Sequence, residues 1–462
     1  MPHPPSILLI QSDQHRFDCV GANGHPFLRT PSLDRLAAEG TRFSHAFCPI
    51  PVCVPSRVSL MHGQWPTEHL AIANQNTEAP RPALGGLPAF SHVLRETGYH
   101  LAHVGKWHVH PHKSPLQYGF HEHVSGRAGY AAWRADVGLP PRPATRGWFG
   151  EVDRYIGPEG TQVAWEADRV IRLLEERATR DAPLFLQWDL DPPHLPNVVP
   201  EPYASMYPPD AIPPWPSYPD PLTGKPYAQA QQRRTWKVEG WTWADWAPIV
   251  GRYLGEISLM DAQIGRVLGA LERFGLAGDT LVIYTTDHGD LCGGHGMVDK
   301  HMVLYDDVTR VPLIVRWPGH ATPGAVCDAF VSHSIDLART LCEAAGAPVP
   351  GTFRGRSLLP LLAGWATNGR QDILSMYHGN QFGLYSQRSV RDRRWKYVWN
   401  ATAEDELYDL DADSEVRNLA TDPAFSGELA RLRRRLVEWM EETRDPLLNA
   451  WTRAQLLEGL SI

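Results

Sequence analysis

Residues 6–13 read SILLIQSD, a short apolar run that ends in polar residues. A continuous apolar run of this length is typical of a strand that is buried on both faces of a parallel sheet. The run therefore predicts a central strand with Asp13 at its carboxyl end. Because ligands of open α/β sheets bind beyond the carboxyl ends of the strands, we expect a site next to Asp13.

The pattern of strand, loop and helix recurs along the chain. Residues 30–40 read TPSLDRLAAEG, an amphipathic helix with a threonine before it and a glycine after it. The same kind of pattern predicts helices at 87–97, 164–178 and 249–274, and strands at 101–104, 184–188, 280–285 and 312–315. This alternation predicts an α/β fold with a large, mostly parallel sheet flanked by helices.

The pattern changes after about residue 365. Short strand-like runs at 384–390 and 395–399 precede a polar helix at about 426–444. We therefore expect two units: an α/β domain over residues 1–365 and a smaller C-terminal α+β subdomain over residues 366–462. A length of 462 residues agrees with this, since it exceeds what one small core needs.

Composition excludes several classes of protein. Hydrophobic residues make up 43 % of the chain, which is enough for a large core, so a disordered or fibrous protein is excluded. The formal net charge of -8 gives no overall attraction to nucleic acid or anionic lipid, and we expect neither partner. The first residues show no signal-peptide pattern and no apolar run is long enough to span a bilayer, so we expect a cytoplasmic protein.

Five segments, far apart in the sequence, carry side chains that bind metals or oxyanions. They hold Asp13 and Gln14; Cys53 and Arg57; Lys106 and His108; His194; and Asp287, His288 and Lys300. Carboxylate, amide and imidazole groups can bind a divalent cation, while lysine, arginine and histidine can hold an oxyanion and move a proton. Each segment alone also has an ordinary reading, as a helix cap or as surface groups.

Cys53 stands out among the six cysteines, which show no CxxC spacing and so predict neither a disulfide framework nor a zinc cluster. It precedes an apolar helical segment and lies near Arg57. A helix N-terminus and a guanidinium both lower the pKa of a thiol, so an ordinary thiolate nucleophile is one interpretation.

The sequence motifs in these segments resemble those of the type I sulfatases, which belong to the alkaline phosphatase superfamily. Residues 53–63 read CVPSRVSLMHG, similar to the signature in which C-x-P-S-R directs oxidation of the cysteine to formylglycine; only Met61-His62 departs from a frequent Leu-Thr. GYHLAHVGKWH at 98–108 and DPPHLP at 191–196 resemble two further motifs. The matches extend to residues 331–337, 407–410 and 418–419, so the resemblance covers nearly the whole chain.

This resemblance implies a site. It implies one divalent metal ion held by Asp13, Gln14, Cys53 in its formylglycine form, Asp287 and His288. It also implies that a formylglycine-generating enzyme matures Cys53. A gem-diol hydroxyl at residue 53 would attack the sulfur of a sulfate monoester and form a covalent sulfate hemiacetal. Three cationic side chains, Arg57, Lys106 and Lys300, would offset the charge on the sulfuryl oxygens, with His194 or Lys300 as the acid toward the leaving alcohol and His108 as the base for sulfate release.

Two departures point to one branch of the superfamily. Many sulfatases have Asp-Asp at 13–14 and Asp-Asn at 287–288, whereas this chain has Asp-Gln and Asp-His. The combination resembles choline sulfatases and phosphonate monoester hydrolases. Because an amide is neutral and an imidazole is a softer ligand, Mn²⁺ becomes a stronger candidate for the metal relative to Ca²⁺, which remains possible. The phosphonate hydrolases do not keep the GKWH motif that this chain has at 105–108, which favours a sulfate ester.

Several alternatives stay open at this stage. A phosphonate monoester or phosphodiester hydrolase could use the same site, and a protein that keeps Cys53 as a thiol could bind anions without catalysis. The proline- and tryptophan-rich stretch from Pro192 to Trp246 is a candidate wall for the leaving group, suited to a sugar ring or a quaternary ammonium, or it could pack only on itself. Apolar residues at 447–457 could dock on a second subunit, making a homo-oligomer, or pack on their own chain.

Overall fold

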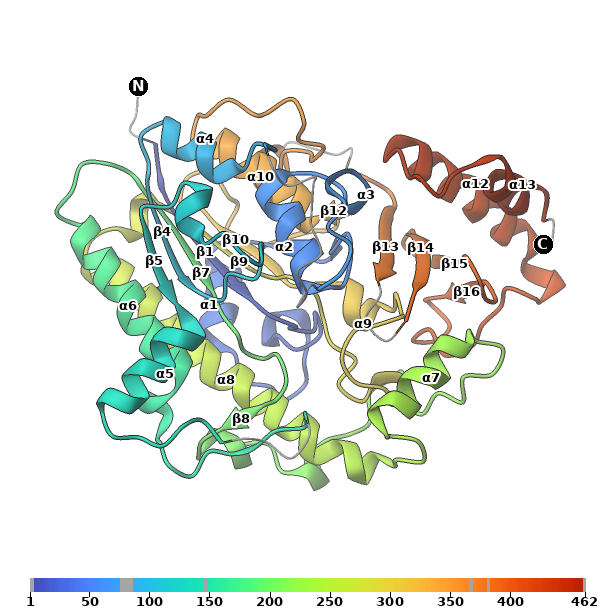
Figure 1. The fold of residues 1–462 in the computed structure, drawn as a ribbon, viewed down its shortest axis with the longest axis horizontal. Helices are drawn as coiled ribbons and strands as arrows, with labels where there is room; N and C mark the ends of the chain where they lie inside the picture. Colours follow the sequence, from blue (N-terminus) through green and yellow to red (C-terminus); the bar gives the residue numbers. More distant parts are fainter. Residues whose placement is uncertain (1–3, 75–85, 144–147, 365–368, 380–382, 460–462) are drawn as a thin grey trace.

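The computed structural model describes residues 4–74, 86–143, 148–364, 369–379 and 383–459. An eight-stranded sheet forms the centre of the molecule. Its strands are β1 (Ser6–Ser12), β2 (Thr41–Phe43), β4 (His100–Gly105), β5 (Glu122–Ser125), β7 (Leu184–Asp189), β9 (Thr280–Thr286), β10 (Leu313–Arg316) and β11 (Ala325–Cys327). They lie in the order β11-β2-β10-β9-β1-β7-β4-β5 (Figure 1).

The apolar run at the start of the chain is the middle of this sheet. β1 pairs in parallel with β7 on one side and with β9 on the other, and its seven residues are all buried. Only β10 runs against its neighbours β9 and β2; the other pairings in the sheet are parallel. The prediction of a large, mostly parallel sheet is confirmed.

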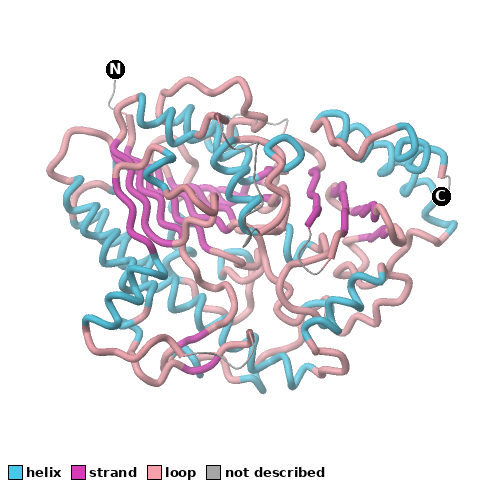
Figure 2. The backbone as a smooth tube through the Cα atoms, viewed as in Figure 1, coloured by secondary structure: helices cyan, strands magenta, loops and turns pink. Residues whose placement is uncertain are grey.

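Helices cover both faces of the sheet, and β1 shows why (Figure 2). Its side chains alternate: Ile7 and Leu9 enter one hydrophobic core, and Leu8 and Ile10 enter another. Three helices close the first core: α2 (Cys53–His62), α4 (Phe90–Glu96) and α10 (His333–Ala344). Three others close the second: α1 (Pro31–Glu39), α6 (Gln162–Arg177) and α8 (Trp243–Arg273).

Shorter elements connect these layers. They are β3 (Ala46–Phe47), α3 (Pro66–His69), α5 (Gly126–Asp136), β6 (Glu151–Val152), β8 (Val198–Val199), α7 (Tyr227–Trp236), α9 (Asp306–Thr309), β12 (Val331–Ser332) and α11 (Leu359–Leu362). Residues 192–226 are irregular apart from β8 and two turns of 3₁₀ helix, because proline lacks the amide hydrogen that regular elements need. Among the described residues, no helix combines the length and the apolar character of a membrane span.

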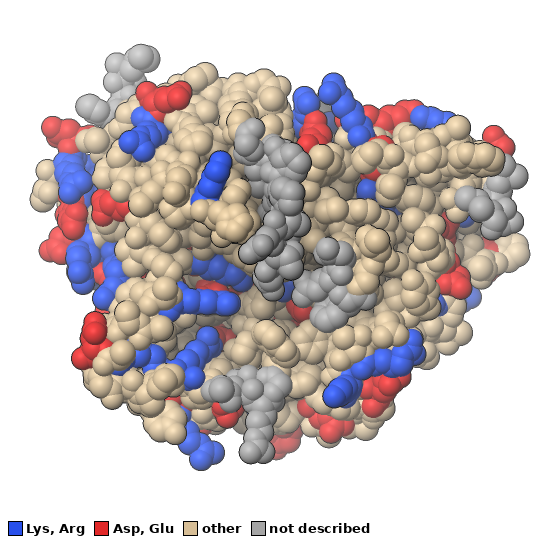
Figure 3. Space-filling view, in the orientation of Figure 1, with Lys and Arg blue, Asp and Glu red and all other residues tan. Residues whose placement is uncertain are grey.

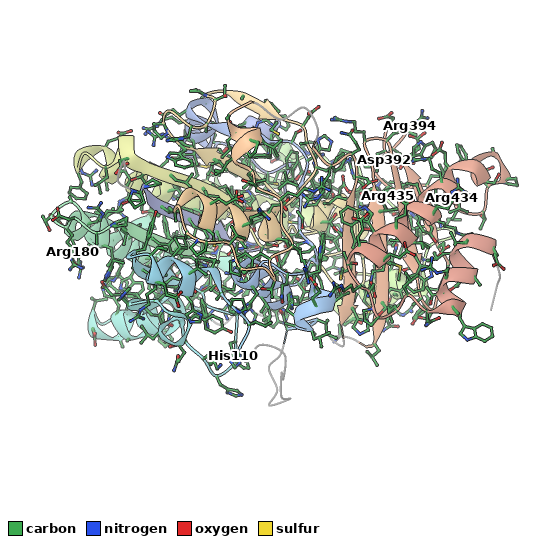
Figure 4. All side chains as sticks on the ribbon, turned by 90° about the horizontal axis from the view of Figure 1, so that it is seen from above. His110, Arg180, Asp392, Arg394, Arg434 and Arg435 are labelled. Atoms are coloured by element: carbon green, nitrogen blue, oxygen red, sulfur yellow. The ribbon has the colours of Figure 1, made fainter. Side chains whose placement is uncertain are left out.

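A second, antiparallel sheet lies toward the C-terminus. Its strands β13 (Ile373–Gly379), β14 (Tyr385–Arg391), β15 (Trp395–Asn400) and β16 (Glu406–Asp409) pair in sequence order, and α12 (Ser426–Glu442) and α13 (Ala450–Glu458) follow. Figure 4 shows this unit, with Arg394 and Arg435 labelled, at the end of the molecule opposite Arg180. The smaller α+β unit is confirmed. The predicted boundary between residues 365 and 366 lies outside the described residues. In α13, Trp451 is 79 % exposed, whereas Leu447 and Leu448 pack on the chain's own core.

Candidate active site

Strand register brings the two predicted aspartates together. Ser12 in β1 pairs with Thr286 in β9, so the residues that follow, Asp13 and Asp287, leave adjacent strands at the same edge of the sheet. The Asp287 amide donates to Ser12 O at 3.3 Å, and both carboxylates are fully buried. Two segments 274 positions apart thus form one site because their strands are neighbours.

A cluster of ligand atoms surrounds this edge. One ligand atom each from Asp13, Cys53, Asp287 and His288 lies within 4.8 Å of the others, and all four residues are buried. Cys53, the first residue of α2, places Sγ 3.2 Å from His288 Nε2 and 3.8 Å from Asp13 Oδ1. Two carboxylates and an imidazole are ligands that divalent metals accept, and in these buried positions they need a counter-charge. The cluster is therefore compatible with a divalent metal.

Arg57 ties the cluster together from the next turn of α2. Its Nη2 donates to Asp13 Oδ2 at 3.0 Å and its Nε to Asp287 Oδ2 at 2.9 Å. Its Nη1 lies 3.4 Å from Asp189 Oδ1 at the end of β7. Burial alone would lower the pKa of this guanidinium, but the aspartates raise it. Arg57 thus offsets the repulsion between buried carboxylates, in addition to its predicted place near the sulfuryl oxygens.

Two lysines approach Cys53 from different loops. Lys106, after β4, donates to Asp13 Oδ2 at 2.5 Å. Lys300 Nζ contacts Asp299 at 3.1 Å and His194 Nε2 at 3.0 Å. Burial would raise the pKa of the Cys53 thiol, but Lys300, Lys106 and His288 bring it well below its usual value. The surroundings of residue 53 are therefore arranged to hold negative charge.

Gln14 lies beside the cluster with its amide already engaged. Its Oε1 accepts from Lys300 Nζ at 2.7 Å, and its Nε2 donates to Asp290 at 2.6 Å and to Asp299 at 3.2 Å. The amide therefore positions Lys300. Its predicted role as a metal ligand stays a prediction, since the same oxygen has a second lone pair.

His108, which lines the cavity, and His288, which is fully buried, differ in their surroundings. Burial lowers the pKa of His108 despite its hydrogen bond to Cys53, so this imidazole is neutral at pH 7 and can accept a proton. His288 behaves in the opposite way: burial lowers its pKa, but Asp287 and Cys53 raise it to about 9. A metal bound at the cluster would compete with that proton.

Sequence reasoning missed several contacts of the site. Asn74 accepts from the amide of Val54 at 3.0 Å and places its Nδ2 3.7 Å from Cys53 Sγ. Asp299 and Asp290 hold Lys300 and Gln14, and Asp191 lies 3.9 Å from Lys106. Asp191 is the first residue of the motif at 191–196 and Asp299 precedes Lys300, so both could have been found by position. Nothing in the sequence around Asn74 separates it from a surface asparagine.

A cavity of about 1070 Å³ opens over these groups. Cys53, Lys106, His108, His194 and Lys300 all line it. The volume is of the size that holds a drug-sized organic molecule. Room therefore exists for a leaving group much larger than the sulfuryl group itself.

The tryptophans of the predicted wall divide into two groups. Trp236 lines the cavity, as do Leu195 and Pro196 from the proline-rich stretch. Four others do not line the cavity and pack in two hydrophobic clusters, one of which also holds Leu195 and Trp236: Trp215, Trp241, Trp243 and Trp246. The stretch thus contributes a narrow part of the wall, and most of its tryptophans serve packing.

Fold and site together define a class. A mostly parallel sheet with aspartates at two strand ends, a nucleophile position at a helix N-terminus and cations around it is the arrangement of a hydrolase of the alkaline phosphatase superfamily. Residues 5–347 match the family described as Sulfatase, and residues 293–442 match "N-sulphoglucosamine sulphohydrolase, C-terminal". The chain belongs to the sulfatase family and is a sulfuric ester hydrolase.

Individual relatives agree with this assignment. An arylsulfatase of Clostridium perfringens is 27 % identical over 486 residues, covering 95 % of this chain and 94 % of that protein. A Δ4,5-hexuronate-2-O-sulfatase of Bacteroides thetaiotaomicron is 26 % identical over 452 residues, covering 96 % and 90 %. The structure of a phosphonate monoester hydrolase of Agrobacterium radiobacter superposes with a TM-score of 0.83 at 27 % identity, covering 95 % and 96 %.

Proposed function

We propose that this chain hydrolyses a sulfate monoester, with formylglycine formed from Cys53 as the nucleophile. The position of Cys53 carries the proposal: its Sγ contacts the Asp13 and His288 side chains and faces the cavity that Lys106, His194 and Lys300 also line. Aldehyde hydration at this residue gives two hydroxyls on one carbon. Both would lie where the thiol now lies.

Asp13, Asp287, His288 and the residue-53 oxygen would hold a divalent metal, with Gln14 as a further candidate, and Ca²⁺ and Mn²⁺ are the two ions we consider. When bound, such an ion supplies positive charge that favours ionisation of a hydroxyl next to it.

Side chains of the cavity would carry the first half of the reaction. A hydroxyl of residue 53 loses its proton to water, and its oxygen forms a bond to sulfur while the bond from sulfur to the leaving oxygen breaks. Arg57, Lys106 and Lys300 offset negative charge on the sulfuryl oxygens. The leaving oxygen takes a proton from Lys300 or His194, whose side chains contact each other, and the alcohol departs.

His108 would carry the second half. As a neutral imidazole beside residue 53, it takes the proton of the remaining hydroxyl. The freed electron pair forms the carbonyl bond, the bond from carbon to the sulfate oxygen breaks, and sulfate leaves. A serine in this position would have no second hydroxyl and so no such route.

The similarity to a phosphonate monoester hydrolase, together with Gln14 and His288, keeps that activity as a second candidate. Lys106 and His108 favour sulfate, since they belong to the motif that phosphonate hydrolases lack. Paired assays on para-nitrophenyl sulfate and para-nitrophenyl phenylphosphonate separate the two: a kcat/KM higher for the phosphonate would contradict the sulfatase proposal.

The first test concerns residue 53 itself. Co-expression with a formylglycine-generating enzyme, the proposed maturation partner, should give a peptide around residue 53 with the mass of the aldehyde, and a hydrazine probe should trap it. A thiol that persists after co-expression would remove the proposed nucleophile.

A further inference from the structure

The outer wall of the cavity is built by segments that do not touch the reacting group. α5 lies beyond the ends of β4 and β5 (Figure 1), and residues 139–142 follow it. Ala131, Ala135, Leu139 and Pro141 make this wall apolar. Trp148, which is 56 % exposed, and Trp236 add two aromatic rings. Such a wall fits the face of a ring.

Arg134 fixes the wall in place. Its Nε donates to Pro140 O at 2.7 Å, and the Leu139 amide donates to Arg134 O at 2.8 Å. The guanidinium is buried and also lies 3.3 Å from Asp153. The segment that leads to Arg142 is therefore anchored to α5.

Two further guanidiniums lie in this wall. Arg142 is 40 % exposed, and its polar contacts with described residues are long, 3.5 Å to Pro196 O and 3.9 Å to Glu256. Arg127 is 69 % exposed; its Nε and Nη2 bind Asp191, and no described residue accepts from its Nη1. Figure 3 shows Lys and Arg side chains gathering on this face of the molecule around α5.

Negative charge is scarce on the same wall. Among the described residues that line the cavity, Asp299 alone has a carboxylate, and it contacts Lys300 and His301 at 3.1 and 3.2 Å. A cationic leaving group in the cavity would thus meet the guanidiniums of Arg127 and Arg142, whose carboxylate neighbours, Asp191 and Glu256, are not part of the cavity lining. The charges disfavour a quaternary ammonium and favour an anion.

We propose that the substrate is a sulfate ester whose organic part carries a ring and a second anionic group, with Arg142 and Arg127 binding that anion and Trp148 and Trp236 the ring. This deepens the proposed function and rests on it. The carboxylate or second sulfate would occupy the outer wall, while the scissile sulfate lies over Cys53.

The test compares matched esters on the aldehyde-bearing enzyme. para-Carboxyphenyl sulfate and para-carbamoylphenyl sulfate have similar shape and differ in charge, and the two corresponding biphenyl esters reach farther along the wall. We expect a higher kcat/KM for the carboxylate of at least one pair. In Arg142→Gln this preference should fall roughly tenfold, because the loss of one charge-assisted hydrogen bond changes kcat/KM by about that factor. Arg142→Lys keeps the positive charge and should keep much of the preference.

Arg154→Gln is the control, because Arg154 is exposed and does not line the cavity. A preference that stays the same in Arg142→Gln for both ring lengths would overturn the anion site while leaving sulfate hydrolysis intact. If the aldehyde-bearing enzyme cleaves no sulfate ester, the proposed function fails. Calorimetry with para-hydroxybenzoate and para-hydroxybenzamide then decides the anion site by itself, since equal affinities would overturn it.

Discussion

Lys300 Nζ lies 3.0 Å from His194 Nε2, and this contact fixes the hydrogen on the imidazole. His194 Nδ1 lies 2.5 Å from Leu195 O, and a carbonyl oxygen only accepts, so Nδ1 carries the hydrogen. Burial would lower the pKa of Lys300, but Asp299 raises it, which keeps the ammonium charged. Lys300 therefore donates to His194 Nε2. In the proposed reaction the proton for the leaving oxygen would therefore come from Lys300, and His194 would orient it.

His194→Ala should slow esters with poor leaving groups far more than para-nitrophenyl sulfate, because only a basic leaving oxygen needs the proton. We expect roughly a hundredfold loss of kcat/KM for an alkyl sulfate. A series of aryl sulfates with rising leaving-group pKa measures this directly. Equal losses across the series would show that His194 does not take part in protonating the leaving group.

His108 predicts a pH dependence. Burial lowers its pKa, so the base form predominates at pH 7 and is lost as pH falls through the lowered value. Wild-type kcat should therefore decrease on the acid side only below that point. His108→Gln should lower kcat by about 10² or more and should lack this limb. If the variant keeps the limb, another group is the base.

Arg57→Lys tests the link between Asp13 and Asp287. A lysine keeps the charge but cannot bridge both carboxylates, so we expect a loss of about 3 kcal/mol in the free energy of unfolding and a large loss of kcat/KM. Arg354→Lys, at a more exposed pair with Glu68, is the control and should cost less than about 1 kcal/mol. Similar losses in both variants would argue against the bridge.

Cys53→Ser separates the two halves of the reaction. A serine hydroxyl can accept the sulfuryl group but offers no second hydroxyl for its release. We expect one equivalent of phenol at most and a serine that keeps the mass of an added sulfuryl group. Sustained turnover by this variant would contradict release through an aldehyde.

Removal of the proposed metal should abolish turnover and lower thermal stability, because the buried carboxylates of Asp13 and Asp287 would keep Arg57 but lose the charge of the ion. After chelation, titration with Mn²⁺ and with Ca²⁺ in separate samples shows which ion restores kcat and melting temperature together. Full activity in the chelated protein, with metal content verified as nil, would exclude the proposed site.

The sequence predicts the strands, the strand ends and the motif residues because each is written in a local pattern. The run at 6–13 becomes β1, and Cys53, Lys106, His194 and Lys300 meet in one cavity. Contacts between residues that are distant in the sequence could not be predicted from local patterns. The link from Asn74 to residue 53 and the two carboxylates that hold Gln14 depend on tertiary positions that no spacing reveals.

The tryptophans also show a limit of what sequence composition can predict. Composition marks the stretch from 215 to 246 as unusual, yet composition does not tell a ring in a cavity from one in a core. Trp236 in α7 and Trp246 at the start of α8 pack in the same hydrophobic cluster, yet only Trp236 also lines the cavity. The exposed ring that does line the cavity, Trp148, lies outside that stretch altogether.

The anchoring of residues 139–142 to α5 has an evolutionary consequence. The groups proposed to hold the sulfuryl unit come from α2 and from loops beyond the strand ends, whereas most of the outer wall comes from α5 and the segment after it. Substitutions in the wall can therefore accumulate without displacing Asp13, Cys53 or Asp287. Related proteins that share this reaction can therefore differ in substrate specificity, because substitutions in the wall segment change which organic sulfate fits.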